Sequence, residues 1–230
     1  MANLLDVIVN IELKKVAGTV SLGKPLIISE IAGGRDYQEF GSLEEVKEVY
    51  TGTNEAENKI VAMAEILFMQ EHKPAKVAIA CTAPAEEGAS TPALVDLLNS
   101  VYDRDWSYLL CLDNTQDTIL ALADIVEANK RKLFVTRTST DTVLEAVNAK
   151  DYSRTVVFFH EPVGEYADAG LVGECGSRTV GEITWKFKTI NGLTAGTFSQ
   201  SKVDDIHKDG AICYITKAGD NITSEGIVVS

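Results

Sequence analysis

Three residues with the side chains of a nucleophilic enzyme site stand at or near the ends of predicted buried strands. They are Cys81, Asp113 and His160. A thiol nucleophile, a histidine base and a carboxylate that orients the histidine are the groups that acyl-transfer and hydrolase chemistry require. Because ligands of an open α/β sheet gather at the carboxyl ends of its strands, these positions suggest a hydrolase-like site.

The sequence around Cys81 does not favour this hypothesis. The cysteine lies in IACTAPAEEG, without the Gly-x-Cys-x-Gly turn that would force a strained backbone and expose the sulfur. Strands of this kind commonly end in polar residues, so a chance triplet is easy to find. A cytosolic α/β hydrolase-like enzyme that uses Cys81, His160 and Asp113 is therefore the alternative hypothesis, and we expect a protein that is not an enzyme.

A glycine-rich stretch, GLVGECGSRTVG at residues 170–181, is the other candidate for chemistry. A phosphate-binding loop needs Gly-x-x-x-x-Gly-Lys-Ser/Thr after a buried strand, and a dinucleotide fingerprint needs Gly-x-Gly-x-x-Gly. The stretch has neither spacing, and it follows EYADAGLVG, which is predicted to be helical. We expect its glycines to end a helix and to adopt positive φ in the loop that follows.

The chain shows no metal-binding or cofactor-binding motif. Its four cysteines, Cys81, Cys111, Cys175 and Cys213, are scattered, and its three histidines stand far apart. No CxxC or His-x-x-x-His spacing is present, so we expect neither a metal nor a cofactor. Apolar surroundings predict that most of the cysteines are buried free thiols of a reducing compartment.

The charge balance argues against a nucleic-acid partner. The net charge is −13, whereas phosphate binding requires clustered Lys and Arg. The basic run Lys130-Arg131-Lys132 stands at the end of a predicted helix, where cations offset the helix dipole. No apolar run reaches the length of a membrane span, and MANLLDVIVNIELKK lacks the features of a secretory signal, which predicts folding in a cytoplasm without direct membrane contact.

The elements that would position these residues alternate between strand and helix. Apolar runs predict strands at 24–32, 77–83, 107–113, 132–138 and 155–162. Periodicity and capping boxes at Ser42/Glu45 and Asn54/Glu57 predict helices at 42–50, 54–70, 91–102, 115–130, 141–149 and 165–173. Farther on, the alternation of residues 184–193 predicts a strand. Residues 201–210 are predicted as a short helix, and residues 212–230 as a hairpin that turns at residues 219–221.

This pattern predicts an α/β fold with a mostly parallel sheet flanked by helices in the middle and β-rich N- and C-terminal segments. Residues 3–13 form the N-terminal strand, in which Leu5, Val7, Val9, Ile11 and Leu13 share one apolar face. We divide the chain into a strand or arm at 1–20, an α/β core at 21–175 and a β-rich part with a hairpin at 176–230.

Three co-linear blocks resemble the contractile-tail sheath proteins of phages, prophages and phage-tail-like bacteriocins. The first is residues 40–80, where a short helix precedes a longer one ending in Phe68-Met69-Gln70, then Pro74 and a buried strand. The second is residues 105–139, with a Trp/Tyr-bearing strand, an alanine-rich helix and a strand. The third runs from Tyr166 to Gly226, and the positions that match the family pattern are Thr184, Lys186, Lys188, Gly192, Tyr214 and Gly226.

The resemblance implies a structural subunit that assembles with itself around a tail tube and contracts to drive the tube through a cell envelope. It implies assembly in the bacterial cytoplasm and a place in a virion tail or phage-tail-like particle. Sheath subunits are joined by exchanged strands, which need an apolar face and free backbone groups. The expected interface residues are Leu5, Val7, Val9, Ile11, Leu13, Ile212, Tyr214, Ile227 and Val229.

Two expectations stay open at this point. Residues 3–13 either add to the hairpin of another subunit at 212–229 or pair within their own sheet. Members of the family are usually longer, with a C-terminal segment that returns to the core and ends in an arm, whereas this sequence ends at GIVVS. The resemblance therefore implies either a short variant or a sequence that lacks part of the subunit.

Overall fold

The computed structural model describes residues 23–85, 93–178 and 182–224. These form an eight-stranded sheet in the order β2-β3-β1-β4-β5-β6-β7-β8. The parallel strands are β1 (Pro25–Glu30), β3 (Val77–Thr82), β4 (Tyr108–Cys111), β5 (Leu133–Thr138), β6 (Thr155–Phe159) and β7 (Ala211–Lys217). Antiparallel strands β2 (Arg35–Phe40) and β8 (Asp220–Thr223) form the two ends of the sheet. The predicted α/β class with a mostly parallel sheet is confirmed.

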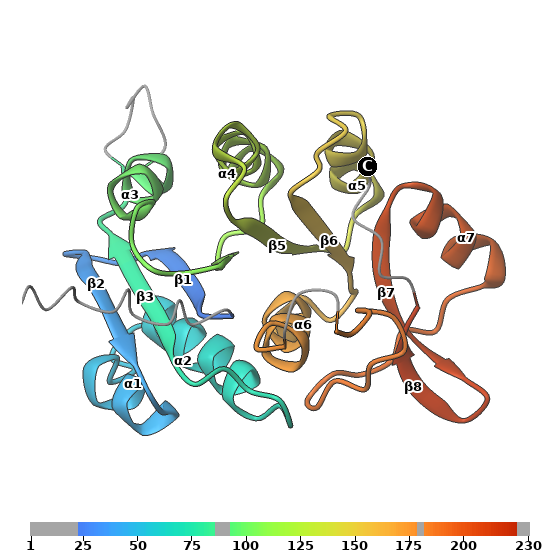
Figure 1. Ribbon diagram of the computed structural model, residues 1–230, viewed down its shortest axis with the longest axis horizontal. Coiled ribbons are helices and arrows are strands. Elements are labelled where there is room, and N and C mark those ends of the chain that lie inside the picture. The colour runs from blue at the N-terminus through green and yellow to red at the C-terminus, as the bar shows by residue number, and fades with distance from the viewer. Residues whose placement is uncertain (1–22, 86–92, 179–181, 225–230) are drawn as a thin grey trace, which may run out of the picture.

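Helices cover both faces of this sheet (Figure 1). One face carries α3 (Ala93–Val101), α4 (Gln116–Asn129), α5 (Asp141–Asn148) and α7 (Gln200–Lys208). The other carries α1 (Leu43–Val49), α2 (Glu55–Phe68) and α6 (Ala167–Cys175), and a 3₁₀ turn, η1 (Val163–Glu165), precedes α6. No helix in the described ranges is long and apolar enough to cross a membrane.

The apolar strand runs fill two cores because successive side chains of a strand point to opposite faces. In β1, Leu26 and Ile28 belong to the core under α3 and α4, whereas Ile27 belongs to the core under α1, α2 and α6. All three side chains are fully buried. Such strands contain apolar residues almost throughout, which is the pattern that located them in the sequence.

Both predicted N-caps are present, and the return bond of each predicted capping box goes to the residue before the N-cap, Gly41 or Thr53. The Ser42 hydroxyl accepts from the Glu45 amide at 3.3 Å, and the Glu45 carboxylate accepts from the Gly41 amide. Asn54 Oδ1 accepts from the Glu57 amide at 2.9 Å at the start of α2. These bonds satisfy N–H groups that have no partner within the helix, so they fix where α1 and α2 begin.

Three expectations about the ends of the sheet need correction. Residues 184–193, predicted as a strand, form no regular strand, and β2 was not expected. The hairpin turn lies at Ala218-Gly219, because Lys217 already pairs with Asp220. Both turn residues have positive φ, as in a type I′ hairpin turn. The predicted strand at 3–13 lies outside the described residues.

Candidate functional site

The three residues of the suggested hydrolase-like site lie on different strands and are not brought together. Cys81 is in β3, Asp113 follows β4, and His160 follows β6. Strand β1 lies between β3 and β4, and β5 between β4 and β6. At about 4.8 Å between neighbouring strands, β3 and β6 stand roughly 19 Å apart. The structure therefore forms no Cys-His-Asp triad from these residues.

The Cys81 thiol is built into the core. Its sulfur is 3.6 Å from the Tyr50 hydroxyl, and only 4% of the residue is exposed. Burial raises the pKa of Cys81 to about 11, although the Tyr50 hydrogen bond acts in the opposite direction. Because the thiolate is the reactive form, this cysteine is a poor nucleophile near neutral pH.

Asp113 and His160 each have a local partner. The Asp113 carboxylate accepts from the Thr115 amide at 3.0 Å and from the Thr118 hydroxyl at 2.6 Å, so it holds the start of α4. His160 Nε2 lies 2.8 Å from the Glu165 carboxylate, at the end of η1. Each contact stabilises the segment that follows its strand, the start of α4 after β4 and η1 after β6. Both side chains therefore have structural roles.

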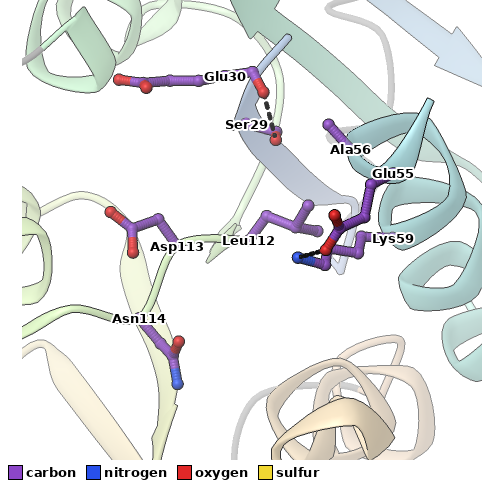
Figure 2. Close-up of a pocket in the computed structure, with 8 residues that line it drawn as sticks. All are labelled: Ser29, Glu30, Glu55, Ala56, Lys59, Leu112, Asp113 and Asn114. Carbon is purple, nitrogen blue, oxygen red and sulfur yellow. Dashed lines mark hydrogen bonds and ion pairs between the residues drawn. The ribbon is translucent and has the colours of Figure 1, made fainter. Parts of the chain in front are cut away.

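A pocket opens where the carboxyl ends of β1 and β4 diverge (Figure 2). After β1 the chain builds β3 on one side of it and then crosses to β4 on the other, and such switch points are where α/β sheets commonly bind ligands. The pocket has a volume of about 460 Å³. Its polar lining includes Glu30, Glu55, Lys59, Asp113 and Asn114.

The charges of this pocket are partly neutralised. Lys59 Nζ lies 2.6 Å from Glu55, on the α2 side. On the other side, burial and the nearby Asp113 carboxylate raise the pKa of Glu30. In the described ranges, no group of three or more His, Cys, Asp or Glu side chains is placed to hold a metal ion. The pocket is thus a mildly acidic crevice.

A buried ion pair lies at the same end of the sheet. Arg137 of β5 donates to the Asp168 carboxylate of α6 at 2.9 Å, and both side chains are at most 4% exposed. The same guanidinium donates to the Leu112 carbonyl oxygen at 3.2 Å and lies over the Tyr166 ring. These contacts tie α6 to the ends of β4 and β5.

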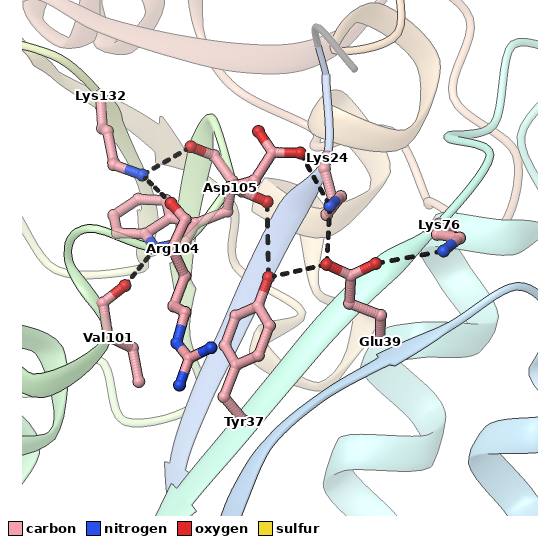
Figure 3. Close-up of polar contacts among 9 residues, drawn as sticks. Lys24, Tyr37, Glu39, Lys76, Val101, Arg104, Asp105 and Lys132 are labelled. Carbon is pink, nitrogen blue, oxygen red and sulfur yellow. Dashed lines mark hydrogen bonds and ion pairs between the residues drawn. The ribbon is translucent and has the colours of Figure 1, made fainter. Parts of the chain in front are cut away.

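A second polar cluster occupies the amino end of the sheet (Figure 3). Lys24, directly before β1, is only 5% exposed. Its ammonium group lies 2.7 Å from Glu39 of β2 and 3.1 Å from Asp105, in the turn before β4. Burial acts to lower the pKa of Lys24, but the two carboxylates outweigh it and the pKa is raised. Tyr37 also donates to Glu39, so this cluster joins β1, β2 and that turn.

The glycine-rich stretch ends a helix as expected, because Gly176 is the C-cap of α6, but its described glycines do not have positive φ. Gly170 and Gly173 lie inside α6 with ordinary helical backbone, and Gly176 has φ −70°. A Cβ at Gly173 would stand 2.9 Å from the Leu67 carbonyl oxygen of α2, and one at Gly170 would stand 2.6 Å from Ile190. Gly170 and Gly173 are therefore required for close packing and not for positive φ, whereas Gly181 lies outside the described residues.

The basic run after α4 is confirmed as a helix end. Lys130 is the C-cap of α4 and has left-handed backbone. Lys132 Nζ donates to the Arg104 and Trp106 carbonyl oxygens and lies 3.8 Å from the centre of a Trp106 ring. The Lys132 ammonium group therefore stabilises the turn before β4 through these two hydrogen bonds.

Only two of the predicted interface residues are described. Ile212 and Tyr214 lie in β7, and each is 1% exposed. The Tyr214 hydroxyl also accepts from the Ile190 amide at 3.1 Å. Both side chains therefore serve the core of their own subunit. The other predicted interface residues, Leu5, Val7, Val9, Ile11, Leu13, Ile227 and Val229, lie outside the described residues.

Sequence reasoning missed the residues that close the outer edge of β8. The Thr223 carbonyl oxygen accepts from the Phe187 amide, and the Thr223 amide donates to the Lys188 carbonyl oxygen. Phe187 is 58% exposed and has φ 60°. The available signal was the alternation of residues 184–193, which indicated an extended segment but not its partner.

Comparison with known proteins finds similarity in fold but not in sequence. No protein-family model and no curated protein sequence matches the chain. Among solved structures, the contracted helical sheath of the anti-feeding prophage (AFP) is similar, with 13% identity and a TM-score of 0.59. So is the six-fold symmetrised AFP baseplate, with 14% identity and a TM-score of 0.64. Each alignment covers 98% of this chain and 68% of the other. At this identity the likeness establishes a fold shared with chains of a contractile prophage particle.

Proposed function

We propose that the protein is a structural subunit of a contractile tail sheath. Copies of it assemble around a tail tube and contract to drive the tube through a cell envelope. The subunit is not an enzyme and uses no cofactor. Assembly takes place in the bacterial cytoplasm, and the product is a phage tail or a phage-tail-like particle.

The observation that carries this proposal is the fold shared with the AFP helical sheath along 98% of the chain. The alignment covers almost the whole chain and is therefore not confined to one part of the sheet. The three sequence blocks that resemble sheath proteins support the same function independently. The dispersed positions of Cys81, Asp113 and His160 remove the main argument for the hydrolase alternative.

Strand exchange is the proposed connection between subunits. The donor is residues 3–13 with Leu5, Val7, Val9, Ile11 and Leu13 on one face, and the receiver is the hairpin region of another copy. An added strand gains main-chain hydrogen bonds along the edge it joins. We also propose that Ile227 and Val229 extend the receiver, while Ile212 and Tyr214 support it from the core.

The base of the donor segment is suited to transmit force. Residues 1–22 join the described fold at Gly23, next to Lys24. The Lys24 ammonium group is held between Glu39 and Asp105, which belong to two other parts of the amino end. A pull on the segment is therefore shared by β1, β2 and the turn before β4.

Sedimentation velocity of the full chain beside a variant without residues 1–13 tests this function. The full chain should form large, concentration-dependent species that the variant does not form. Circular dichroism and thermal unfolding of the variant show whether its fold is intact, since the described fold begins at Gly23. Equal association of both proteins, or of neither, would contradict strand exchange through residues 3–13.

The similarity to the AFP baseplate, with its TM-score of 0.64, favours a second candidate. In this case the chain is a subunit of a ring at the end of a tail. The two functions differ in the growth of the assembly, because stacked sheath rings grow with protein concentration whereas a baseplate ring closes at a fixed mass. The same sedimentation experiment separates them.

A further inference from the structure

The outer edge of the C-terminal hairpin is closed by residues 185–189, which we call the edge cover. The Thr223 amide of β8 donates to the Lys188 carbonyl oxygen at 3.0 Å, and the Thr223 carbonyl oxygen accepts from the Phe187 amide at 2.9 Å. Strand β7 occupies the other side of β8. The edge cover therefore takes the backbone groups of Thr223, which an added strand would use.

Side-chain bonds of Thr223 complete this closure. The Thr223 hydroxyl accepts from the Lys188 amide at 2.9 Å and donates to the Trp185 carbonyl oxygen at 2.7 Å. The Thr189 hydroxyl donates to the Asn221 carbonyl oxygen at 3.3 Å. Because most of these bonds meet at one residue, loss of the Thr223 contacts would remove most of the hydrogen bonds between the edge cover and β8, while Trp185 still packs against the core.

The edge cover is strained at its centre. Phe187 has φ 60°, in the left-handed region that a side chain with a Cβ rarely adopts. Its ring is 58% exposed, and the ammonium group of Lys186 lies 5.1 Å from the ring centre. Closure of the hairpin therefore forces an unfavourable backbone and leaves a large apolar ring mostly in solvent.

The sequence of this segment favours a different conformation. Residues 184–193 alternate as a strand does, yet the structure makes no regular strand there. Segments whose local preference conflicts with the folded structure are expected at functional or strained sites. The edge cover is such a segment, and it lies on the edge that the proposed function needs to open.

The opposite edge of the sheet is protected in another way. Strand β2 carries Arg35, Asp36 and Glu39, and its register shifts between Arg35 and Gln38. Charges and bulges on an edge strand discourage strand addition permanently. Glu39 is also held by Lys24 at the amino end. Among the described residues, a separate segment bonds to the outer edge of β8 but not to that of β2.

We propose that the edge cover is a releasable strap that keeps the hairpin closed in the free subunit and moves aside when a strand of a second copy adds to β8. The strand is residues 3–13 of that copy, so this inference rests on the proposed function. The strap competes with strand addition, so free subunits join only at a higher concentration than they would with the edge open.

The donor segment has the length and pattern that this occupant requires. Residues 14–22 connect the donor strand to Gly23, and these nine residues span roughly 30 Å when extended at about 3.3 Å per residue. That span is several times the spacing of about 4.8 Å between neighbouring strands, so the donor is not confined to the strands beside β1. The alternation of residues 3–13 provides one apolar face and one mostly polar face.

Hydrogen exchange of the full chain tests whether the strap opens. The amides of Phe187 and Thr223, which bond across the strap, should exchange at least about 100-fold faster than those of Phe158 and Phe159 in the centre of the sheet. Equal protection of the two sets would overturn the proposal, because the strap would then open only when the whole protein unfolds.

Variants at two positions should shift the strap in opposite directions. Thr223→Val removes the hydroxyl that holds Lys188 and Trp185, so it should speed exchange of the Phe187 amide by at least about 5-fold. Phe187→Gly adopts positive φ without strain, so it should slow exchange of the amide at position 187. The controls are Thr216→Val, which loses a hydroxyl bond elsewhere in the hairpin, and Phe187→Ala, which loses the ring but keeps the strained Cβ.

A fluorescent peptide of residues 3–13, NLLDVIVNIEL, is the binding probe for these full-length proteins. Thr223→Val should bind it at least about 5-fold more tightly than wild type, and Phe187→Gly at least about 5-fold more weakly, because a bound strand needs the strap open. Unchanged affinity in both variants would overturn the proposal. If the peptide binds as expected but the chain never assembles, the proposed sheath function fails and the strap stands. If the chain assembles but both variants bind the peptide with the affinity of wild type, the strap proposal fails and the proposed sheath function stands.

Discussion

Gly173 of α6 lies directly against Leu67 of α2. A Cβ at this glycine would stand 2.9 Å from the Leu67 carbonyl oxygen and 3.2 Å from its Cα. Helix α6 is buried along its whole length, so it cannot shift to make room without disturbing the core. The glycines of the sequence that most resembles a ligand loop are therefore part of helix packing.

Gly173→Ala should lower the free energy of unfolding by about 1–3 kcal/mol, because the added methyl group meets backbone that cannot move aside. Without that contact, alanine would stabilise a helix interior by up to about 1 kcal/mol, so the sign of the change is diagnostic. Gly164→Ala is the control, since a Cβ there meets nothing within 4 Å. Urea unfolding of both variants measures the difference, and equal stability would show that α2 and α6 are not packed this closely.

The buried pair Arg137–Asp168 should show strong coupling. Asp168→Asn or Arg137→Met alone should cost about 3–5 kcal/mol, because each leaves part of a buried ionic contact uncompensated. The double variant should cost clearly less than the sum of the two. Chemical unfolding of the four proteins gives the coupling energy. Additive effects would mean that the 2.9 Å contact contributes no coupling of its own.

Acid should weaken the amino-end cluster. Hydrogen bonds from Lys24 and Lys76 hold the pKa of Glu39 below its ordinary value of 4.5. Because the folded-state pKa is the lower one, this stabilisation is complete above about pH 4.5 and is lost as the pH falls through the folded-state pKa. Glu39→Gln should therefore reduce the loss of stability between pH 6 and pH 3 by about 1 kcal/mol.

The control for this measurement is Glu48→Gln. Glu48 is an exposed residue of α1 and makes no ion pair within the described part of the chain. Its substitution should leave the pH dependence of unfolding almost unchanged. Identical profiles for Glu39→Gln and wild type would show that the Lys24 cluster is not intact in solution.

The four cysteines should be inert in the folded protein. All are buried, and burial raises the pKa of Cys81 to about 11 and that of Cys175 to about 12. At pH 8 a thiol of pKa 11 has roughly 200-fold less thiolate than one of pKa 8.5. Ellman's reagent should release four equivalents from unfolded protein and far less than one within minutes from folded protein. A fast single equivalent that disappears in Cys81→Ser would revive the enzyme alternative.

The central strands were predictable because a strand buried on both faces is apolar throughout, as Leu26, Ile27 and Ile28 show. Helix starts were predictable where a cap and its partner are three residues apart, as Asn54 and Glu57 are. Strand β2 was missed because its sequence, RDYQEF, is mostly polar and exposed. An edge strand is held in the sheet by backbone hydrogen bonds to its neighbour. Because any residue type except proline can form these bonds, they leave little pattern in the sequence.

The candidate sites were harder to predict because they depend on strand order and tertiary contact. The sequence places Cys81, Asp113 and His160 at strand ends but does not show that β1 and β5 separate them. The need for glycine at Gly173 comes from Leu67, more than a hundred residues earlier in the chain. Phe187 adopts left-handed backbone through its contacts with Thr223, against its local preference.

Electron microscopy of the purified full chain at rising concentration tests the central claim most directly. A sheath subunit predicts rings at low concentration and hollow tubes of stacked rings at high concentration, with a diameter that stays constant as the tubes lengthen. Single closed rings of fixed height would favour the baseplate function instead. Uniform monomers at every concentration would contradict self-assembly, and with it the account of this chain as a contractile-sheath subunit.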